Sequence, residues 1–102
     1  MTSPLTLRVA SEFGCWPTWN DQTGDNLDPA DLPVPAALID RIKAWDDAFQ
    51  ATLDRAYPPD SRFPTKADET AWFEEGDAVF SALVEILGPD DVRRSDPSPR
   101  QP

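Results

Sequence analysis

Histidine is absent from this chain of 102 residues, and Cys15 is its single cysteine. Histidine is the usual general base near neutral pH and a common ligand of transition metals. Without it, neither a Ser-His-Asp nor a Cys-His arrangement can form, and one cysteine cannot make an internal disulfide or a multi-cysteine zinc site. We therefore expect a protein that is not an enzyme, that uses no cofactor or metal, and that works in a reducing compartment.

Long apolar runs and excess basic charge are lacking as well. No segment approaches the roughly 18 consecutive apolar residues of a membrane span, and the N-terminal stretch lacks the organisation of a signal peptide. The chain has 9 Lys and Arg against 19 Asp and Glu, which gives a formal net charge of −10. We expect a soluble, cytoplasmic protein that binds neither membranes nor nucleic acid and whose charge attracts a basic protein.

The apolar content is sufficient for one modest core, because 39% of the chain is hydrophobic and its length is near the common size of a domain. The C-terminal stretch SDPSPRQP, in contrast, has nothing to bury. We expect one compact domain over residues 1–94 and a disordered, proline-rich tail over residues 95–102.

Only one segment shows the period-two alternation of a β-strand. Residues 5–10 read LTLRVA, with apolar side chains at every second position before Ala10. Pro17 then interrupts the pattern, and residues 20–33, NDQTGDNLDPADLP, are turn-forming throughout. The sequence therefore predicts a strand at 5–10 followed by turns up to the first helix.

Two helices are predicted from apolar residues that recur every three or four positions. The first covers residues 35–57 and ends at Pro58-Pro59. Its apolar stripe consists of Leu38, Ile42, Trp45, Phe49, Leu53 and Ala56. The second covers residues 66–87, with Thr65 as N-cap and with Gly88-Pro89 after its last residue.

The order of these elements predicts an α+β fold of β-α-α-β type, in which residues 90–93 begin a short second strand. Gly76 lies within the apolar face of the second helix, where we expect a close neighbour, either an aromatic ring or the first helix. Two strands alone are marginal in water. Either the helices cover the small sheet, or another chain completes its free edge.

Aromatic residues and carboxylates provide the candidate binding residues. Trp16 and Trp19 are either anchors for a protein partner or rings that close one end of the core. The aspartates of residues 20–33 fail the EF-hand calcium template and are explained by turn formation. The adjacent pairs Asp46-Asp47 and Glu74-Glu75 are interpreted as solvated helix faces, because neighbours in a helix point about 100° apart.

Two acidic surfaces are predicted, one on each helix. The first helix carries Asp40, Asp47 and Asp54 opposite its apolar stripe. The second carries Glu74, Asp77 and Glu85 beside a narrow stripe of alanines, Ala67, Ala71, Ala78 and Ala82. If the first helix packs on the aromatic face of the second, this alanine stripe remains free to receive a partner.

Several motifs together resemble a set of small acidic bacterial proteins, common in actinobacteria, that have no assigned activity. The motifs are FGCWPTW at 13–19, LDPADLP at 27–33, Trp45 in the first helix, and AWFEEGDAVFSALVEILG at 71–88. The resemblance covers about residues 7–92. It implies a small cytoplasmic α+β protein with no catalytic residues to transfer to this chain.

The sequence thus favours a non-enzymatic module that binds a basic protein, as immunity proteins and similar inhibitors do. The candidate binding residues are Trp16, Trp19, Asp40, Asp47, Asp54, Glu74, Asp77 and Glu85. The alternative is a structural module that forms a homodimer through a strand edge or through the alanine stripe.

Overall fold

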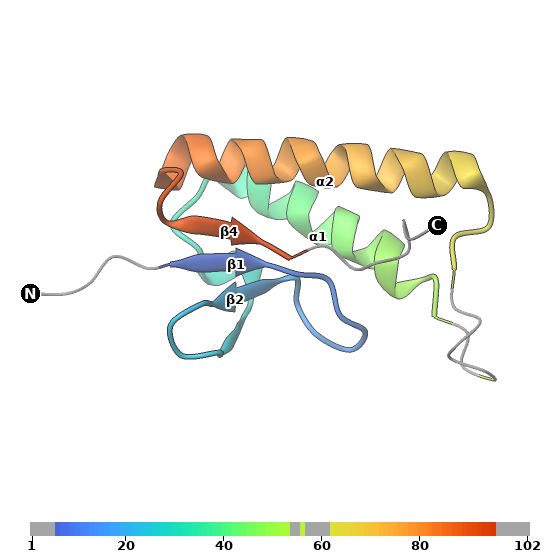
Figure 1. The fold of residues 1–102 in the computed structure, drawn as a ribbon, viewed down its shortest axis with the longest axis horizontal. Helices are drawn as coiled ribbons and strands as arrows, with labels where there is room; N and C mark the ends of the chain where they lie inside the picture. The colour runs from blue at the N-terminus through green and yellow to red at the C-terminus, as the bar shows by residue number, and fades with distance from the viewer. Residues whose placement is uncertain (1–5, 54–55, 57–61, 96–102) are drawn as a thin grey trace, which may run out of the picture.

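A computed structural model of the chain describes residues 6–53, 56 and 62–95 (Figure 1). Its elements in chain order are β1 (Leu7–Val9), β2 (Thr18–Asn20), β3 (Asn26–Leu27), the 3-10 helix η1 (Pro29–Asp31), α1 (Ala36–Gln50), α2 (Lys66–Leu87) and β4 (Val92–Arg94). The α+β class and the β-α-α-β order are confirmed. The predicted tail falls outside the described residues, apart from Ser95.

The strands form one sheet in the order β3-β2-β1-β4. β1 is antiparallel to β2 and parallel to β4, which returns to the sheet after both helices, with Leu7 opposite Val92. The prediction of a single strand before the first helix, with turns throughout 20–33, was wrong at β2 and β3. Strands of three and two residues are too short to show an alternating pattern, and only pairing with β1 identifies them.

The helices cover one face of the sheet: in Figure 1, α1 lies behind the strands and α2 runs alongside β4. The inward side chains of β1, Leu7 and Val9, are buried together with Val92 of β4. Thr18 of β2 is also fully buried, and its hydroxyl donates to the carbonyl of Leu27 at 2.7 Å. The other face of the sheet is turned away from the helices.

α1 ends at Gln50, earlier than the predicted boundary at residue 57. The amide of Thr52 bonds to the carbonyl of Phe49 and that of Leu53 to the carbonyl of Gln50, so the last turn tightens to i→i+3 bonds. The Thr52 hydroxyl also donates to the Phe49 carbonyl, at 2.7 Å. The predicted stop at Pro58-Pro59 lies outside the described residues.

α2 has the predicted bounds and the predicted N-cap. The Thr65 hydroxyl accepts a hydrogen bond from the amide of Asp68 at 3.0 Å, and Gly88 follows the helix with φ of 99°. A Cβ placed on Gly76 would lie 2.9 Å from the ring of Trp45. The expectation that an aromatic ring or the first helix approaches this glycine is therefore confirmed, since the ring belongs to α1.

Candidate functional site

The loop between β1 and β2 is held against α1 by one side chain, Gln50. Its amide nitrogen donates to the carbonyls of Glu12 (2.9 Å) and Cys15 (3.2 Å), and its amide oxygen accepts from the amide of Gly14 (2.9 Å). Gly14 has φ of 79°, a conformation that favours glycine. These contacts fix the shape of residues 12–15 on the surface of the helix.

This loop presents two aromatic rings to solvent. Phe13 is 38% exposed and Trp16 is 37% exposed, yet both are well anchored. The Phe13 ring stacks on Phe49 with centroids 4.6 Å apart, and the backbone of Trp16 exchanges hydrogen bonds with the side chain of Asn26. Anchored aromatic rings that remain exposed are typical of protein-binding surfaces, because they bury a large area at little entropic cost.

A hollow of about 370 Å³ lies between the loop and α1. It is lined by Gly14, Cys15, Trp16, Asn26, Asp46 and Gln50, and we call it the loop–helix pocket. Asp46 is 4% exposed, and the Gln50 amide donates to its carboxylate at 3.1 Å. Loss of solvation raises the pKa of Asp46, and the nearby Asp47 raises it further, while the hydrogen bond from Gln50 opposes the rise.

The interpretation of Asp46-Asp47 as a solvated pair was wrong for Asp46 and holds for Asp47, which is exposed. Asp46 lies four residues after Ile42 and three before Phe49, so it continues the apolar stripe of α1. That spacing is the signal in the sequence that could have identified a buried carboxylate.

The predicted acidic residues are distributed over different sides of the two helices. Asp40 and Asp47 are exposed on α1, while Asp54 falls outside the described residues. Glu74 and Glu85 are exposed on α2, and Asp77 of that helix forms an ion pair with Arg94 of β4. Asp47 follows the pocket residue Asp46 along α1, and the lining of the pocket contains none of the predicted α2 carboxylates.

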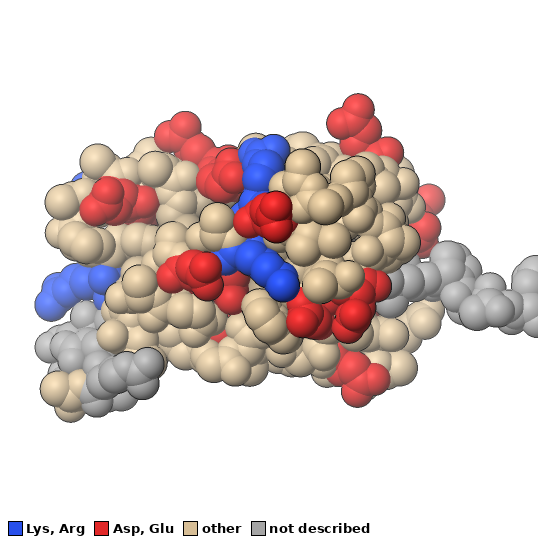
Figure 2. Space-filling view, turned by 180° about the vertical axis from the view of Figure 1, so that it is seen from behind, with Lys and Arg blue, Asp and Glu red and all other residues tan. Residues whose placement is uncertain are grey.

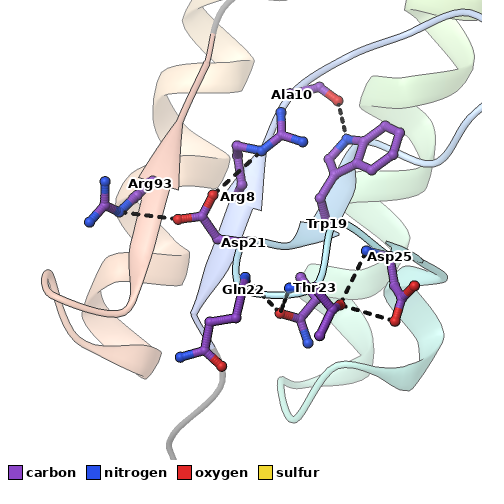
Figure 3. A network of polar contacts seen from close by, with 9 residues as sticks. Arg8, Ala10, Trp19, Asp21, Gln22, Thr23, Asp25 and Arg93 are labelled. Atoms are coloured by element: carbon purple, nitrogen blue, oxygen red, sulfur yellow. Dashed lines mark hydrogen bonds and ion pairs between the residues drawn. The ribbon is translucent and has the colours of Figure 1, made fainter.

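Trp19 lies on the outer face of the sheet, within a polar network (Figure 3). Its indole nitrogen donates to the carbonyl of Ala10 at 2.9 Å, and the Arg8 guanidinium lies 5.2 Å from its ring centroid. Asp21 forms ion pairs with Arg8 at 3.6 Å and with Arg93 of β4 at 3.3 Å. These contacts favour the structural role that the sequence left open for Trp19.

Asp25 and Asp28 of residues 20–33 also make contacts within the fold. Asp28 accepts from the amide of Ala30 and so caps η1, and it forms an ion pair with Lys43 at 3.6 Å. Asp25 accepts from the hydroxyl of Thr23 at 3.0 Å. In the part of the chain that the structure describes, no group of three or more Asp, Glu, Cys or His could hold a metal ion.

α1 packs on the aromatic face of α2, which leaves Ala67, Ala71 and Ala78 exposed. An interhelical groove of about 420 Å³ adjoins this stripe. It is lined by Ala44, Trp45, Ala48, Phe63, Pro64, Asp68, Ala71, Trp72 and Glu75. Arg41 of α1 bridges to Glu75 of α2 through two hydrogen bonds, of 2.8 and 3.1 Å.

Seen from behind, acidic side chains are spread over the surface, and basic side chains lie in a narrow band across the middle and in a separate group at the left edge (Figure 2). Two basic residues of α1 form ion pairs with acidic residues outside this helix: Arg41 pairs with Glu75, and Lys43 pairs with Asp28. Among the described helices, neither is long and apolar enough to cross a membrane.

Comparison with known proteins gives one family. A family model described as Serratia CdiI immunity protein-like matches residues 5–92, which include every strand and helix from β1 to α2 and the first residue of β4. The match also includes the loop–helix pocket and the interhelical groove. No curated protein matches the chain.

Proposed function

We propose that this chain, which belongs to the Serratia CdiI immunity protein-like family, binds a toxic protein and holds it inactive. The observation that supports this proposal is the match over residues 5–92, because it includes the complete two-helix layer and the aromatic loop. An immunity protein needs only to bind its target, which agrees with a chain that lacks histidine and carries anchored, exposed aromatic rings.

The binding surface that we propose consists of Phe13 and Trp16 on the loop together with Asp40 and Asp47 on α1. The two rings are the buried anchors of the complex, since exposed aromatics held by stacking and hydrogen bonds lose little entropy on binding. The two carboxylates and the net charge of −10 accelerate encounter with a basic partner. The partner is therefore a basic toxic protein, and this chain acts without catalysis.

The test screens the proteins encoded by the genes on either side of this chain's own gene for a toxic protein that this chain binds. Co-expression should restore growth, and the purified proteins should form a complex whose association rate falls as salt is added. Trp16→Ala should weaken binding by about 30-fold or more, corresponding to about 2 kcal/mol for an aromatic anchor. The double change Asp40→Asn and Asp47→Asn should mainly slow association.

The matched control is the double change Glu74→Gln and Glu85→Gln on the exposed side of α2, which should leave binding almost unchanged. If the α2 variant weakens binding and the α1 variant does not, the proposed surface is wrong. If no toxin binds and sedimentation shows a dimer that persists at high salt, the homodimer alternative replaces the proposed function.

A further inference from the structure

We propose that the loop–helix pocket receives one arginine side chain of the partner, whose guanidinium pairs with the buried carboxylate of Asp46 and lies against Trp16. This inference rests on the proposed function and deepens it, because it names a chemical group that the toxic protein must present. The pocket is separate from the interhelical groove, which lies between α1 and α2 and has Asp68 and Glu75 in its lining.

The Asp46 carboxylate has unused capacity for hydrogen bonds. An ionised carboxylate has about four acceptor sites, and in the described part of the chain Gln50 supplies the one side-chain donor to it. Asp46 is nevertheless buried, with an exposed fraction of 4%. Since Asp46 lines the hollow, the acceptor sites that Gln50 leaves unused are available there to a cation or to further donors.

The residues that line the loop–helix pocket suit a guanidinium group. Trp16 provides an aromatic ring beside the carboxylate of Asp46, and Cys15 and Asn26 complete the lining. The Cys15 carbonyl and the Asn26 side chain are already bonded to Gln50 and to the Trp16 backbone. Arginine suits such a lining better than lysine, because its planar guanidinium donates several hydrogen bonds in one plane and stacks on aromatic rings. Ligand pockets of about 300–1,000 Å³ hold small molecules, so a hollow of about 370 Å³ suits one long side chain.

The loop–helix pocket is already formed in the chain without a partner. Gln50 bonds to Glu12, Gly14 and Cys15, and Asn26 holds both the amide and the carbonyl of Trp16. Lys43 of α1 is engaged with Asp28, and its ammonium lies 5.3 Å from the ring centroid of Trp16. A rigid, preformed site avoids the entropy loss of ordering the loop when the partner binds.

The first experiment tests the pocket without the toxin. Capped arginine, N-acetyl-arginine methylamide, is titrated into the protein while NMR follows the Trp16 indole and the Gly14 amide, with capped norleucine as the uncharged probe. Asp46→Asn has the same shape as the native residue, and the adjacent, exposed Asp47→Asn is the matched control. We expect arginine to bind the wild type and Asp47→Asn equally, and Asp46→Asn at least about tenfold more weakly.

Three results would overturn the pocket: no arginine-dependent shift in the wild type, equal shifts with norleucine, or equal binding by Asp46→Asn. Circular dichroism checks that the variant is folded. Should Asp46→Asn fail to fold, Trp16→Ala takes its place, because the ring is exposed and its loss should weaken arginine binding. Unchanged binding by Trp16→Ala would then reject the proposal.

The second experiment uses the toxic protein and separates the two proposals. Loss of a partner in a buried charge pair typically weakens a complex about 30-fold or more, mainly through faster dissociation. We expect this for Asp46→Asn and little change for Glu85→Gln, because Glu85 is exposed on α2 and lies outside the proposed binding surface. If the wild type does not bind the toxin, the proposed function fails. If the toxin binds the wild type and Asp46→Asn equally, the function stands and the arginine pocket is wrong.

Discussion

Trp45 of α1 and Trp72 of α2 bind each other's backbone reciprocally. The Trp45 indole nitrogen donates to the Trp72 carbonyl at 3.0 Å, and the Trp72 indole nitrogen donates to the Trp45 carbonyl at 2.9 Å. Their rings stack with centroids 4.9 Å apart and planes inclined by 12°. This pair fixes the register of one helix on the other, and so fixes which sides of α1 remain for the loop and for a partner.

Replacing Trp45 with phenylalanine should destabilise the protein by about 1–3 kcal/mol. The variant keeps an aromatic ring but removes the indole donor to the Trp72 carbonyl in a buried position. Alanine at the same site should cost about 3–5 kcal/mol, because it also leaves a cavity. Urea unfolding measures both changes. Trp16→Phe, at an exposed site, is the control and should stay within about 0.5 kcal/mol.

Gly76→Ala should lower stability, although alanine is better than glycine by about 1 kcal/mol in a helix. The new Cβ would lie 2.9 Å from the Trp45 ring, which the reciprocal bonds prevent from moving away. We expect a net loss of about 1–3 kcal/mol in urea unfolding. The Cβ would also lie 2.8 Å from Nη2 of Arg94, which is the end of a flexible side chain and can shift. In the Trp45→Phe background the loss should shrink, because the other two close atoms belong to the indole. A stabilising effect in the wild type would contradict the close contact.

Gln50→Ala should release the loop between β1 and β2. The change removes the acceptor for the Gly14 amide and the donor to the carbonyls of Glu12 and Cys15. Hydrogen exchange at Gly14 should therefore accelerate, with amides in the middle of α2 unaffected. Gln22→Ala, at an exposed turn position, serves as the control. Equal protection of Gly14 in the wild type and Gln50→Ala would show that other contacts hold the loop.

Asp46→Asn should stabilise the free protein at neutral pH. Burial raises the pKa of Asp46 in the folded chain above its ordinary value of 3.8, so the folded chain holds this proton more tightly than the unfolded chain. Stability then falls as pH rises from 3.8 through the folded pKa, and above it the penalty is present in full. The asparagine removes the penalty and still accepts from Gln50.

The measurement is urea unfolding of the wild type, Asp46→Asn and Asp47→Asn at a series of pH values. The advantage of Asp46→Asn over the wild type should be greatest at neutral pH, shrink as pH falls through the folded pKa of Asp46, and vanish below 3.8. Asp47→Asn controls for a change of net charge. A variant less stable than the wild type at neutral pH would mean that the charged hydrogen bond to Gln50 outweighs the burial of the charge.

The second helix is the clearest case of structure that local sequence determines. Thr65 provides an acceptor for a free amide at the helix start, Gly88 adopts a positive φ at its end, and both effects act within a few residues. The glycine at position 76 could also be interpreted in advance, because a residue without a side chain in an apolar face requires a close neighbour. The charge excess and the absence of histidine are likewise properties of the sequence itself.

Only the tertiary structure decided the rest. β2 and β3 form because Thr18 pairs with Val9 on one side and with Leu27 on the other. Strands of two or three residues are too short for their sequence pattern to predict them. Asp46 became a buried carboxylate, and Asp47 an exposed one, because the loop anchored by Gln50 covers one side of α1 and not the other. Periodicity specifies that a helix has two faces, whereas contacts between distant segments decide what covers each face.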